Sequence, residues 1–328
     1  MVFGYYPSWT SRLPIRDIKH ERFTHLAHAF LQAEPDGRLK EDVTIPKAAF
    51  AASARAKGAK ALLSLGGADS GAVFRAIAND PEALKRYVDR IVEVQRATGY
   101  DGFDVDWEFP EDEADRESMT RLVRALREAA PEAFLSMAAP ATHWNGRWWD
   151  AEALRGIVDL LNVMAYDLYG PWSERAGHPS ALRAEAGEGR ELCGEAAIEY
   201  WTMKRGWPAH KVALGIPCYG RTFPVERWKE KPADHEVDLF LPWHEIRRRI
   251  DQPDWVRTWS AEAGVPTLSR KDGKQVIGYD DPESAKLKGA WARARGLAGI
   301  FFWQIEQDFR EGDHEIVRAG VEGLLRRR

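Results

Sequence analysis

Short apolar runs recur along the chain, and most are followed by a segment in which apolar residues return every three or four positions. Apolar runs of this length, bounded by turn residues, are typical of buried strands. Eight runs qualify: Val2–Tyr6, His25–Leu31, Lys60–Leu65, Gly102–Trp107, Phe134–Ala139, Leu160–Tyr166, Val212–Cys218 and Ala298–Trp303. Helical spacing occurs at Pro46–Lys57, Pro81–Thr98, Asp112–Ala130, Ala151–Gly156, Arg190–Gly206, Pro282–Gly296 and His314–Leu325.

Strands that alternate with amphipathic helices predict parallel βα units. Eight such units in a chain of 328 residues predict an α/β fold, namely a closed TIM (β/α)8 barrel. An open doubly wound sheet is the alternative. No G-x-G-x-x-G follows the first predicted strand, however, as it would in a dinucleotide-binding sheet of that type.

One interval is too long for an ordinary βα connection. Between Gly220 and Gly278 the chain carries a charged stretch, a helical pattern and two strand-like pieces, at Arg227–Asp238, Trp243–Arg249, Trp255–Trp259 and Lys274–Tyr279. The aromatic content of this interval favours a folded unit over a long loop. We therefore expect a barrel formed by residues 1–221 and 278–328, with a small α+β insertion at 222–277 that lies between strands 7 and 8.

Composition and charge narrow the function classes. The chain is 44% hydrophobic and 30% charged, as expected for a globular protein. Its formal net charge of −4 argues against non-specific binding to nucleic acid or to an anionic membrane. No apolar run is long enough to span a bilayer. Met1 leads almost directly into a strand-like run, so we expect no signal peptide in this chain. A mature secreted protein whose signal peptide has been removed would begin in the same way. Cys193 and Cys218 are too few for a disulfide framework.

Tryptophan is unusually frequent, with 14 residues. A large core would account for some of them. Several others, including Trp9, Trp144, Trp172 and Trp259, lie in loop-like contexts, and exposed aromatic side chains mark binding surfaces. Flat aromatic rings stack well on the weakly polar faces of sugars, so this pattern favours a carbohydrate ligand.

Three carboxylates alternate with large apolar residues in the predicted fourth strand. Asp104, Asp106 and Glu108 are each separated by one apolar residue. Because successive strand residues point to opposite faces, the three acids share one face. Carboxylates this close cannot all ionise without cost, so we expect at least one raised pKa. A carboxyl group with a pKa near neutrality is suited to general acid catalysis.

Two other interpretations of this acidic face remain open at this point. The acids could form the solvated face of an edge strand whose apolar side points inward. They could also bind Ca²⁺ or Mg²⁺ through oxygen ligands.

A TIM barrel places its active site at the C-terminal ends of the strands. Glu108 lies at such an end, with Asp106 and Asp104 progressively deeper, so Glu108 is best placed to meet a substrate. The other predicted strand ends also carry polar or aromatic residues, and we expect them to converge on one barrel mouth. They are Tyr5, Tyr6, Ser64-Leu65-Gly66-Gly67, Met164-Ala165-Tyr166-Asp167, Tyr219-Gly220-Arg221 and Trp303-Gln304.

These segments resemble the motifs of glycoside hydrolase family 18, the chitinase family. Asp101–Glu108 is similar to the family's D-x-x-D-x-D-x-E signature, and Ser64–Gly67 to its S-x-G-G motif. The resemblance continues at four further segments: Met164–Asp167 (M-x-Y-D), Gly215–Arg221, Tyr279–Ser284 and Gly299–Trp303. The matches are ordered and extend from Gly4 to Asp308.

The resemblance implies a retaining, substrate-assisted hydrolysis of β-1,4-linked N-acetylglucosamine polymers or oligomers, in which the substrate's own acetamido group is the nucleophile. Glu108 would protonate the leaving oxygen and then act as the base for water. Asp106 would hydrogen-bond the acetamido N–H, and Asp104 would share a proton with Asp106. Tyr166 would hydrogen-bond the acetamido oxygen, and Asp167 would hold the distorted sugar.

The resemblance also implies supporting and substrate-binding residues. Trp303 would stack beneath the distorted sugar, and Trp172 would flank the cleavage point. The remaining positions line the cleft or support the buried aspartates: Tyr5, Ser64, Met164, Tyr219 and Arg221. Trp9 and Trp144 are candidates for outer subsites from composition and placement alone. Ala68 departs from the family, which often has an aromatic residue there, and this would weaken binding on the leaving-group side.

Two alternative functions are carried forward. One is an endo-β-N-acetylglucosaminidase that acts on N-glycans, or a peptidoglycan hydrolase, although Asp106, Tyr166 and Asp167 together favour a chitinase. The other is a non-catalytic chitin-oligosaccharide lectin, but such relatives typically lose the terminal acid, and Glu108 is present. We expect no cofactor and no metal, because the acids are explained without an ion. The expected protein is a secreted monomer that binds chitin or N-acetylglucosamine oligosaccharides, with a cytoplasmic location as the alternative.

Overall fold

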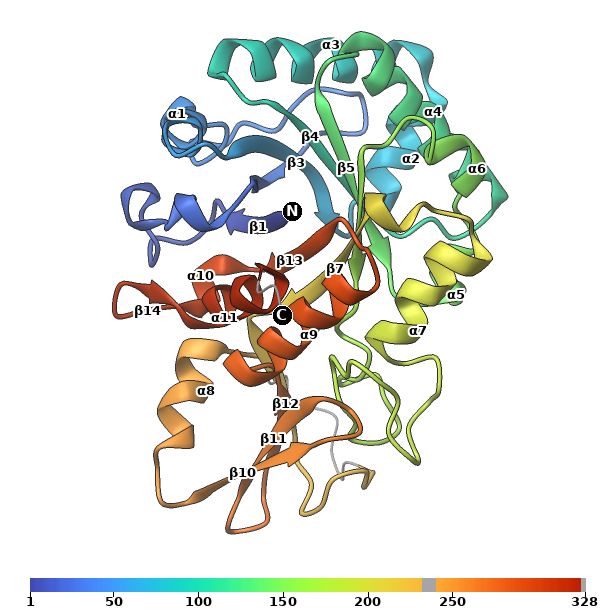
Figure 1. The fold of residues 1–328 in the computed structure, drawn as a ribbon. Helices are drawn as coiled ribbons and strands as arrows, with labels where there is room; N and C mark the ends of the chain where they lie inside the picture. The colour runs from blue at the N-terminus through green and yellow to red at the C-terminus, as the bar shows by residue number, and fades with distance from the viewer. Residues whose placement is uncertain (232–239, 326–328) are drawn as a thin grey trace.

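The computed structural model describes residues 1–231 and 240–325. Eight parallel strands form one closed barrel, which confirms the predicted TIM fold (Figure 1). Its strands are β1 (Val2–Pro7), β2 (His25–Leu31), β3 (Lys60–Ala68), β4 (Gly102–Glu108), β5 (Phe134–Pro140), β6 (Leu160–Met164), β7 (Val212–Pro217) and β13 (Gly299–Trp303). Strands that are neighbours in the barrel follow the chain order, and β13 pairs with β1 to close the ring.

Helices surround the barrel (Figure 1). They are α1 (Ala48–Ala56), α2 (Gly71–Asn79), α3 (Pro81–Thr98), α4 (Glu113–Ala129), α5 (His143–Gly146), α6 (Ala151–Leu154), α7 (Gly194–Glu199), α9 (Pro282–Ala294), α10 (Ile305–Asp308) and α11 (Glu315–Leu325). The predicted helices are all present, but the one predicted at Arg190–Gly206 begins only at Gly194 and ends in a π-helical turn at Tyr200–Lys204. The short helices α2, α5 and α10 were not predicted.

The remaining elements are short. They are the 3-10 helices at Ile15–Asp17, His20–Arg22 and Ala209–Lys211, and the two-residue strands β14 (Phe309–Arg310) and β15 (Asp313–His314).

Local sequence explains where the long helices begin. The Asp80 side chain accepts hydrogen bonds from the backbone N–H groups of Glu82 and Ala83, and Pro81 occupies the first turn of α3. Gly99 ends this helix in the left-handed conformation, with φ of 78°. Such capping groups satisfy backbone donors and acceptors that a helix end leaves unpaired, so the bounds of α3 match the prediction from sequence.

A second sheet interrupts the barrel between β7 and β13. Its five antiparallel strands lie in the order β10–β11–β12–β8–β9. The elements are β8 (Tyr219–Phe223), β9 (Phe240–Pro242), α8 (Trp243–Ile250), β10 (Trp255–Ser260), β11 (Val265–Arg270) and β12 (Val276–Tyr279). Residues 232–239 of the predicted insertion, including most of the charged stretch Arg227–Asp238, lie outside the described residues.

Two features of this sheet differ from the sequence prediction. Strand β11 was not predicted, because it contains Pro266, and proline argues against a strand interior. Tyr219–Arg221 was expected at the end of a barrel strand, but it belongs to β8. The chain leaves the barrel at Cys218, whose N–H donates to the Trp303 carbonyl and whose carbonyl accepts from the Trp243 N–H.

The barrel separates two apolar layers. One lies between the barrel and the helices and contains Phe103, Val105 and Trp107 from one face of β4. The other fills the barrel interior and includes Tyr5 and Tyr166 among its members. Because strand residues alternate between the two faces, the acids of β4 point into the barrel. No helix in the described ranges is long and apolar enough to cross a bilayer.

Candidate active site

Asp104 lies deepest of the three acids and is fully buried. In the sheet register it stands directly between Ser64 of β3 and Ser136 of β5. The Ser64 hydroxyl donates to its Oδ2 at 2.8 Å, and the Ser136 hydroxyl donates to its Oδ1 at 2.6 Å. Burial raises the pKa of Asp104, and the hydrogen bonds from the two serines partly offset this effect. The edge-strand interpretation is therefore wrong, because this part of the acidic face is enclosed.

Asp106 lies one layer closer to the barrel mouth and is 3% exposed. Its strand neighbour is Gly66, with φ of 100°. A Cβ atom at Gly66 would lie 2.4 Å from the Asp106 carbonyl oxygen, so this position requires glycine. Among the described residues, no hydrogen-bond partner reaches the buried Oδ1 of Asp106. Burial, followed by the nearby Glu108 and Asp104 carboxylates, raises its pKa well above the usual value.

Glu108 ends β4 at the rim and is partly exposed. Burial raises the pKa of Glu108 to about 7, and the charges of Asp167 and Asp69 contribute to the same shift. A protonated fraction of this carboxyl is therefore present at neutral pH, which is the condition for a general acid. The prediction of a raised pKa among these acids agrees with the structure.

The end of β6 supplies the second group of site residues. Tyr166 is buried, and its ring lies edge-on to those of Tyr219 and Phe301, at centroid distances of 6.2 and 5.9 Å. Asp167 has a positive φ of 53°. The Nε of Arg221 donates to Asp167 Oδ1 at 2.9 Å, so β8 of the second sheet orients an acid of the barrel mouth.

Tyr5 and Trp303 complete the barrel interior beside the acids. The Tyr5 hydroxyl accepts a hydrogen bond from Asn162 Nδ2 at 3.3 Å. Burial raises the pKa of Tyr5 well above its usual value, and the charges of Asp104 and Asp106 add to the shift. The Tyr5 and Trp303 rings meet edge to face, with centroids 5.3 Å apart.

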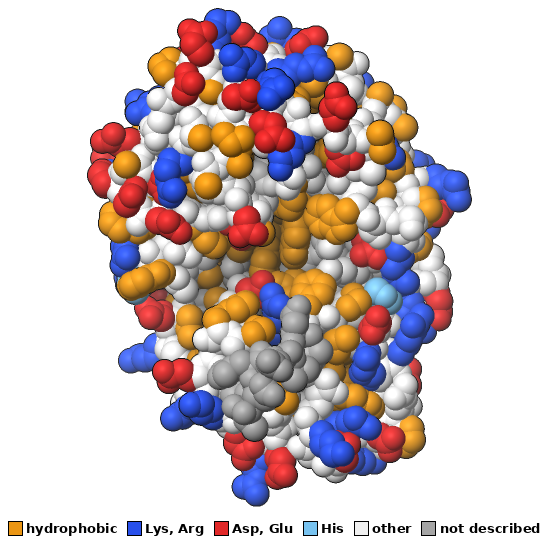
Figure 2. All heavy atoms as spheres, turned by 180° about the vertical axis from the view of Figure 1, so that it is seen from behind, with side chains coloured by type: hydrophobic (Ala, Val, Ile, Leu, Met, Phe, Trp, Pro, Cys, Tyr) orange, Lys and Arg blue, Asp and Glu red, His pale blue; other side chains and the backbone are white. Residues whose placement is uncertain are grey.

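Aromatic rings extend from the acids along the surface. Trp303 stacks on Phe30 at 5.6 Å, and Phe30 stacks on Trp9, which is 56% exposed, at 5.8 Å. The face shown in Figure 2 is hollowed at its centre, and hydrophobic side chains gather in that hollow. This row of rings offers a flat apolar path that leads to the barrel mouth.

A cavity of about 750 Å³ opens beside Glu108. Its lining includes Met164, Tyr166 and Asp167 from the end of β6. It also includes two exposed tryptophans, Trp144 from the short helix α5 and Trp172 from the loop after β6. The Arg221 guanidinium lies 5.3 Å from the centroid of the Trp172 ring. The structure therefore brings the predicted site residues together at the barrel mouth or directly beneath it.

Three expectations from the sequence concern Tyr6, the pair of Asp104 and Asp106, and Ala68. Tyr6 does not join the site: it lies on the opposite face of β1 from Tyr5, and its hydroxyl donates to the Leu13 carbonyl. A proton shared between Asp104 and Asp106 stays a prediction, since the Asp104 oxygens accept from the two serines. Ala68 is exposed where an aromatic residue was expected from the family.

The structure also adds residues that sequence reasoning missed. Ser136 holds Asp104, Asn162 donates to Tyr5, Phe30 carries the aromatic row, and Asp69 raises the pKa of Glu108. Ser136 and Asn162 interrupt apolar runs at the centres of predicted strands, and this was the available signal. Asp69 lies in a loop, where the sequence offers no such contrast.

Comparisons with a family model, with related sequences and with solved structures all point to the same family of proteins. The model of the family described as glycosyl hydrolases family 18 matches residues 1–308. A class V chitinase of Arabidopsis thaliana is 29% identical over 92% of this chain and 85% of its own length. The sporulation-specific chitinase 2 of Saccharomyces cerevisiae is also 29% identical, over 81% of this chain and 58% of its own length. The structure of an Ostrinia furnacalis Group IV chitinase in complex with allosamidin superimposes with a TM-score of 0.89, at 25% identity over 97% of both chains.

The contact between Ser136 and Asp104 predicts a stability effect. Ser136→Ala leaves one oxygen of a fully buried carboxyl without its donor, which costs about 1–3 kcal/mol of unfolding free energy. Urea unfolding at neutral pH measures this loss. Ser269→Ala, at a half-buried position near the end of β11, is the control and should change stability by much less. Equal effects of the two substitutions would show that the Ser136 hydrogen bond contributes no specific stabilisation.

Proposed function

The chain belongs to family 18 of the glycosyl hydrolases, and on this basis we propose that it is a chitinase that hydrolyses β-1,4-linked N-acetylglucosamine polymers or oligomers. One observation carries the proposal. A rim carboxyl with a pKa of about 7, Glu108, stands two residues along the strand from Asp106, a buried carboxyl with an oxygen that lacks a hydrogen-bond partner among the described residues. The first can donate a proton to a leaving oxygen, and the second can accept the N–H of an acetamido group.

The proposed reaction has two steps. In the first, protonated Glu108 gives its proton to the glycosidic oxygen while the acetamido oxygen attacks the anomeric carbon, so one C–O bond breaks and another forms. In the second, Glu108 takes a proton from water, and the water oxygen displaces the acetamido oxygen from that carbon. Two inversions give overall retention, without a nucleophile from the protein.

Asp106 acts on the acetamido group in this scheme. Its unpartnered Oδ1 accepts the acetamido N–H, which orients the carbonyl oxygen toward the anomeric carbon. Positive charge develops on this group during attack, and a fixed hydrogen-bond acceptor in a buried site stabilises that charge more than water does. Asp104, held by the two serines, keeps this part of the strand rigid beneath Asp106.

The neighbouring residues bind the sugar. Tyr166 is proposed to hydrogen-bond the acetamido oxygen, and Asp167, oriented by Arg221, to hold the distorted ring. Trp303 is proposed to stack beneath that ring. Sugars on either side would contact the row of Trp303, Phe30 and Trp9, or the cavity lined by Met164, Trp172 and Trp144.

The insertion has a place in the same proposal. We propose that residues 222–277 form a separate unit that deepens the substrate cleft. In support, Phe240 of β9 stacks on Tyr219 at 4.4 Å and lies 5.4 Å from the Arg221 guanidinium. We further propose that the protein acts as a monomer and that it is secreted, because polymeric chitin lies outside cells.

Replacement of the proposed acid gives the first test of function. Glu108→Gln keeps the shape of the side chain but removes its proton transfer, so the kcat for N-acetylated chitin oligosaccharides should fall by about 10³-fold or more. Binding of the same oligosaccharides, measured by calorimetry, should persist. Glu111→Gln, three residues further along and exposed, is the matched control and should retain activity. Near-normal turnover by the Glu108 variant would refute the proposed acid.

A product comparison tests the substrate class. The wild-type protein should cleave acetylated chito-oligosaccharides and release N-acetylglucosamine oligomers. An N-glycopeptide, assayed side by side under the same conditions, should remain largely intact. Cleavage of the glycopeptide alone would contradict the chitinase proposal and favour the endo-β-N-acetylglucosaminidase.

The pH dependence should reflect the neighbours of Glu108. The protonated form is the active acid, so kcat/KM should fall as pH rises through about 7. Asp69→Asn removes a negative charge that raises the Glu108 pKa, so the basic limb should move to lower pH by a few tenths of a unit. Asparagine tolerates the φ of 64° at this position.

The control for the pH profile is Asp89→Asn, on the exposed face of α3. It changes the net charge equally but should leave the basic limb in place. Added salt should shrink the effect of Asp69→Asn, because mobile ions screen exposed charges. A basic limb that does not move would contradict the coupling between Asp69 and Glu108.

A further inference from the structure

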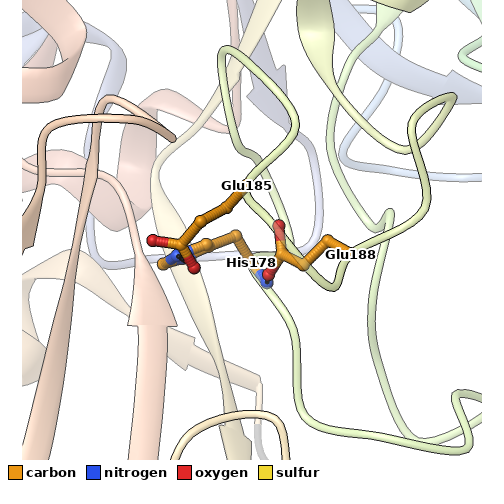
Figure 3. A group of neighbouring side chains, drawn as sticks. All are labelled: His178, Glu185 and Glu188. Atoms are coloured by element: carbon orange, nitrogen blue, oxygen red, sulfur yellow. Dashed lines mark hydrogen bonds and ion pairs between the residues drawn. The ribbon is translucent and has the colours of Figure 1, made fainter.

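A second cluster of titratable side chains lies away from the three acids of β4. His178, Glu185 and Glu188 point toward one another from the loop between β6 and α7 (Figure 3). One ligand atom from each of the three lies within 4.8 Å of the other two. The loop packs against the second sheet here, because the Ser260 hydroxyl of β10 donates to Glu185 Oε1 at 2.6 Å.

His178 is the most unusual member of the cluster. Its side chain is 1% exposed, yet neither ring nitrogen has a hydrogen-bond partner among the described residues. Its Nε2 lies 3.6 Å from Glu185 Oε2, beyond hydrogen-bond length. Burial lowers the pKa of His178 to about 4, so the ring is neutral and carries one lone pair. A buried imidazole normally pairs both nitrogens, so this lone pair is available to a ligand.

Glu188 also has an unused buried oxygen. Its Oε1 accepts the backbone N–H of His178 at 2.9 Å, which holds the carboxylate beside the ring. Its Oε2 is buried without a hydrogen-bond partner among the residues the structure describes. The ring nitrogens of His178 and this oxygen therefore lie close together, and no described residue hydrogen-bonds any of them.

We propose that His178, Glu185 and Glu188 form a binding site for a divalent transition-metal ion, with Zn²⁺ as the expected occupant. One imidazole and two carboxylates are a ligand set that suits Zn²⁺ and related ions, and a water molecule would complete four-coordination. Ca²⁺ and Mg²⁺ prefer oxygen ligands alone and are disfavoured by the imidazole. The expectation of no metal was drawn from the acids of β4, which are a different group of residues.

Lys229 offers the competing explanation, in which an ammonium group already neutralises the cluster. Its Nζ lies 2.8 Å from Glu185 Oε2 and donates to the Ala186 carbonyl. This contact satisfies Glu185 but leaves Glu188 Oε2 and both nitrogens of His178 unpaired. The side chain of Lys229 is 30% exposed, so it can turn toward solvent when an ion binds. The two explanations make opposite predictions for removal of the lysine.

A bound ion would act on the cleft as well as on the loop. It would join the loop, through Glu185 and its partner Ser260, to the second sheet. Glu191 and Leu192, three and four residues after Glu188 in the chain, line the cavity beside Glu108. The ion would therefore fix one wall of that cavity without touching the reacting groups, and binding can be measured without an activity assay.

The test is a titration of the chelator-treated 328-residue protein with Zn²⁺, followed by calorimetry and by thermal unfolding. Wild-type protein should bind one ion saturably, and its midpoint of unfolding should rise because the ion binds the native state. His178→Asn and Glu188→Gln should each weaken binding at least tenfold. Lys229→Met should tighten binding, since it removes the competing cation. His210→Asn, at an exposed histidine, is the control and should bind as wild type does.

The possible results separate the alternatives. Absence of saturable binding to wild-type protein, or equal affinity in the His178 and His210 variants, would overturn the proposal. If Lys229→Met destabilises the protein and does not tighten Zn²⁺ binding, the cluster is an ion pair between Lys229 and the glutamates and not a metal site. Equal or tighter binding of Ca²⁺ would overturn the assigned metal class. Glu188→Gln keeps the shape of the side chain. A circular dichroism spectrum of this variant that matches the wild-type spectrum shows that weaker Zn²⁺ binding is not due to loss of folding.

Discussion

The structure depends on the burial of carboxyl groups inside a closed barrel. An ionised carboxylate loses its hydration when it is enclosed, so each buried acid must either keep its proton or find hydrogen-bond donors. Asp104 meets this demand through serines on both neighbouring strands. Asp106 meets it only in part, because one of its oxygens has no partner among the described residues. In the proposed reaction, the N–H of the substrate's acetamido group donates to this unpartnered Asp106 oxygen at the barrel mouth.

The same constraint arranges the acids by depth. The pKa of Asp104 and Asp106 is raised mainly by burial, and that of Glu108 reaches about 7 at the rim, where solvent and substrate have access. Strand β4 runs from the barrel interior to the rim, and it therefore presents similar side chains to different surroundings. In the proposed reaction, this difference in environment separates the proton donor from the groups that orient the substrate, although all are carboxyls on one strand.

The loops and the second sheet act on this central strand from outside. Arg221 of β8 orients Asp167, and the loop after β6 contributes Trp172 to the cavity wall. The cluster of His178, Glu185 and Glu188 lies where that loop meets the second sheet through Ser260. In the proposed reaction the barrel supplies the reacting groups, and the loop, which contacts the second sheet at Ser260, forms part of the cavity wall.

The sequence alone determined the barrel, its eight strands and the three acids of β4, because strand alternation and helical spacing are local properties of the chain. Only the tertiary structure showed that Ser136 meets Asp104, that Tyr6 faces away from the site, and that Tyr219–Arg221 belongs to the second sheet. These depend on strand register and on where the chain leaves the barrel. The cluster at His178 likewise depends on how the loop folds and on Ser260, which is far away in the chain. Hydrophobic periodicity records which face a residue occupies, but it does not record which residue lies opposite.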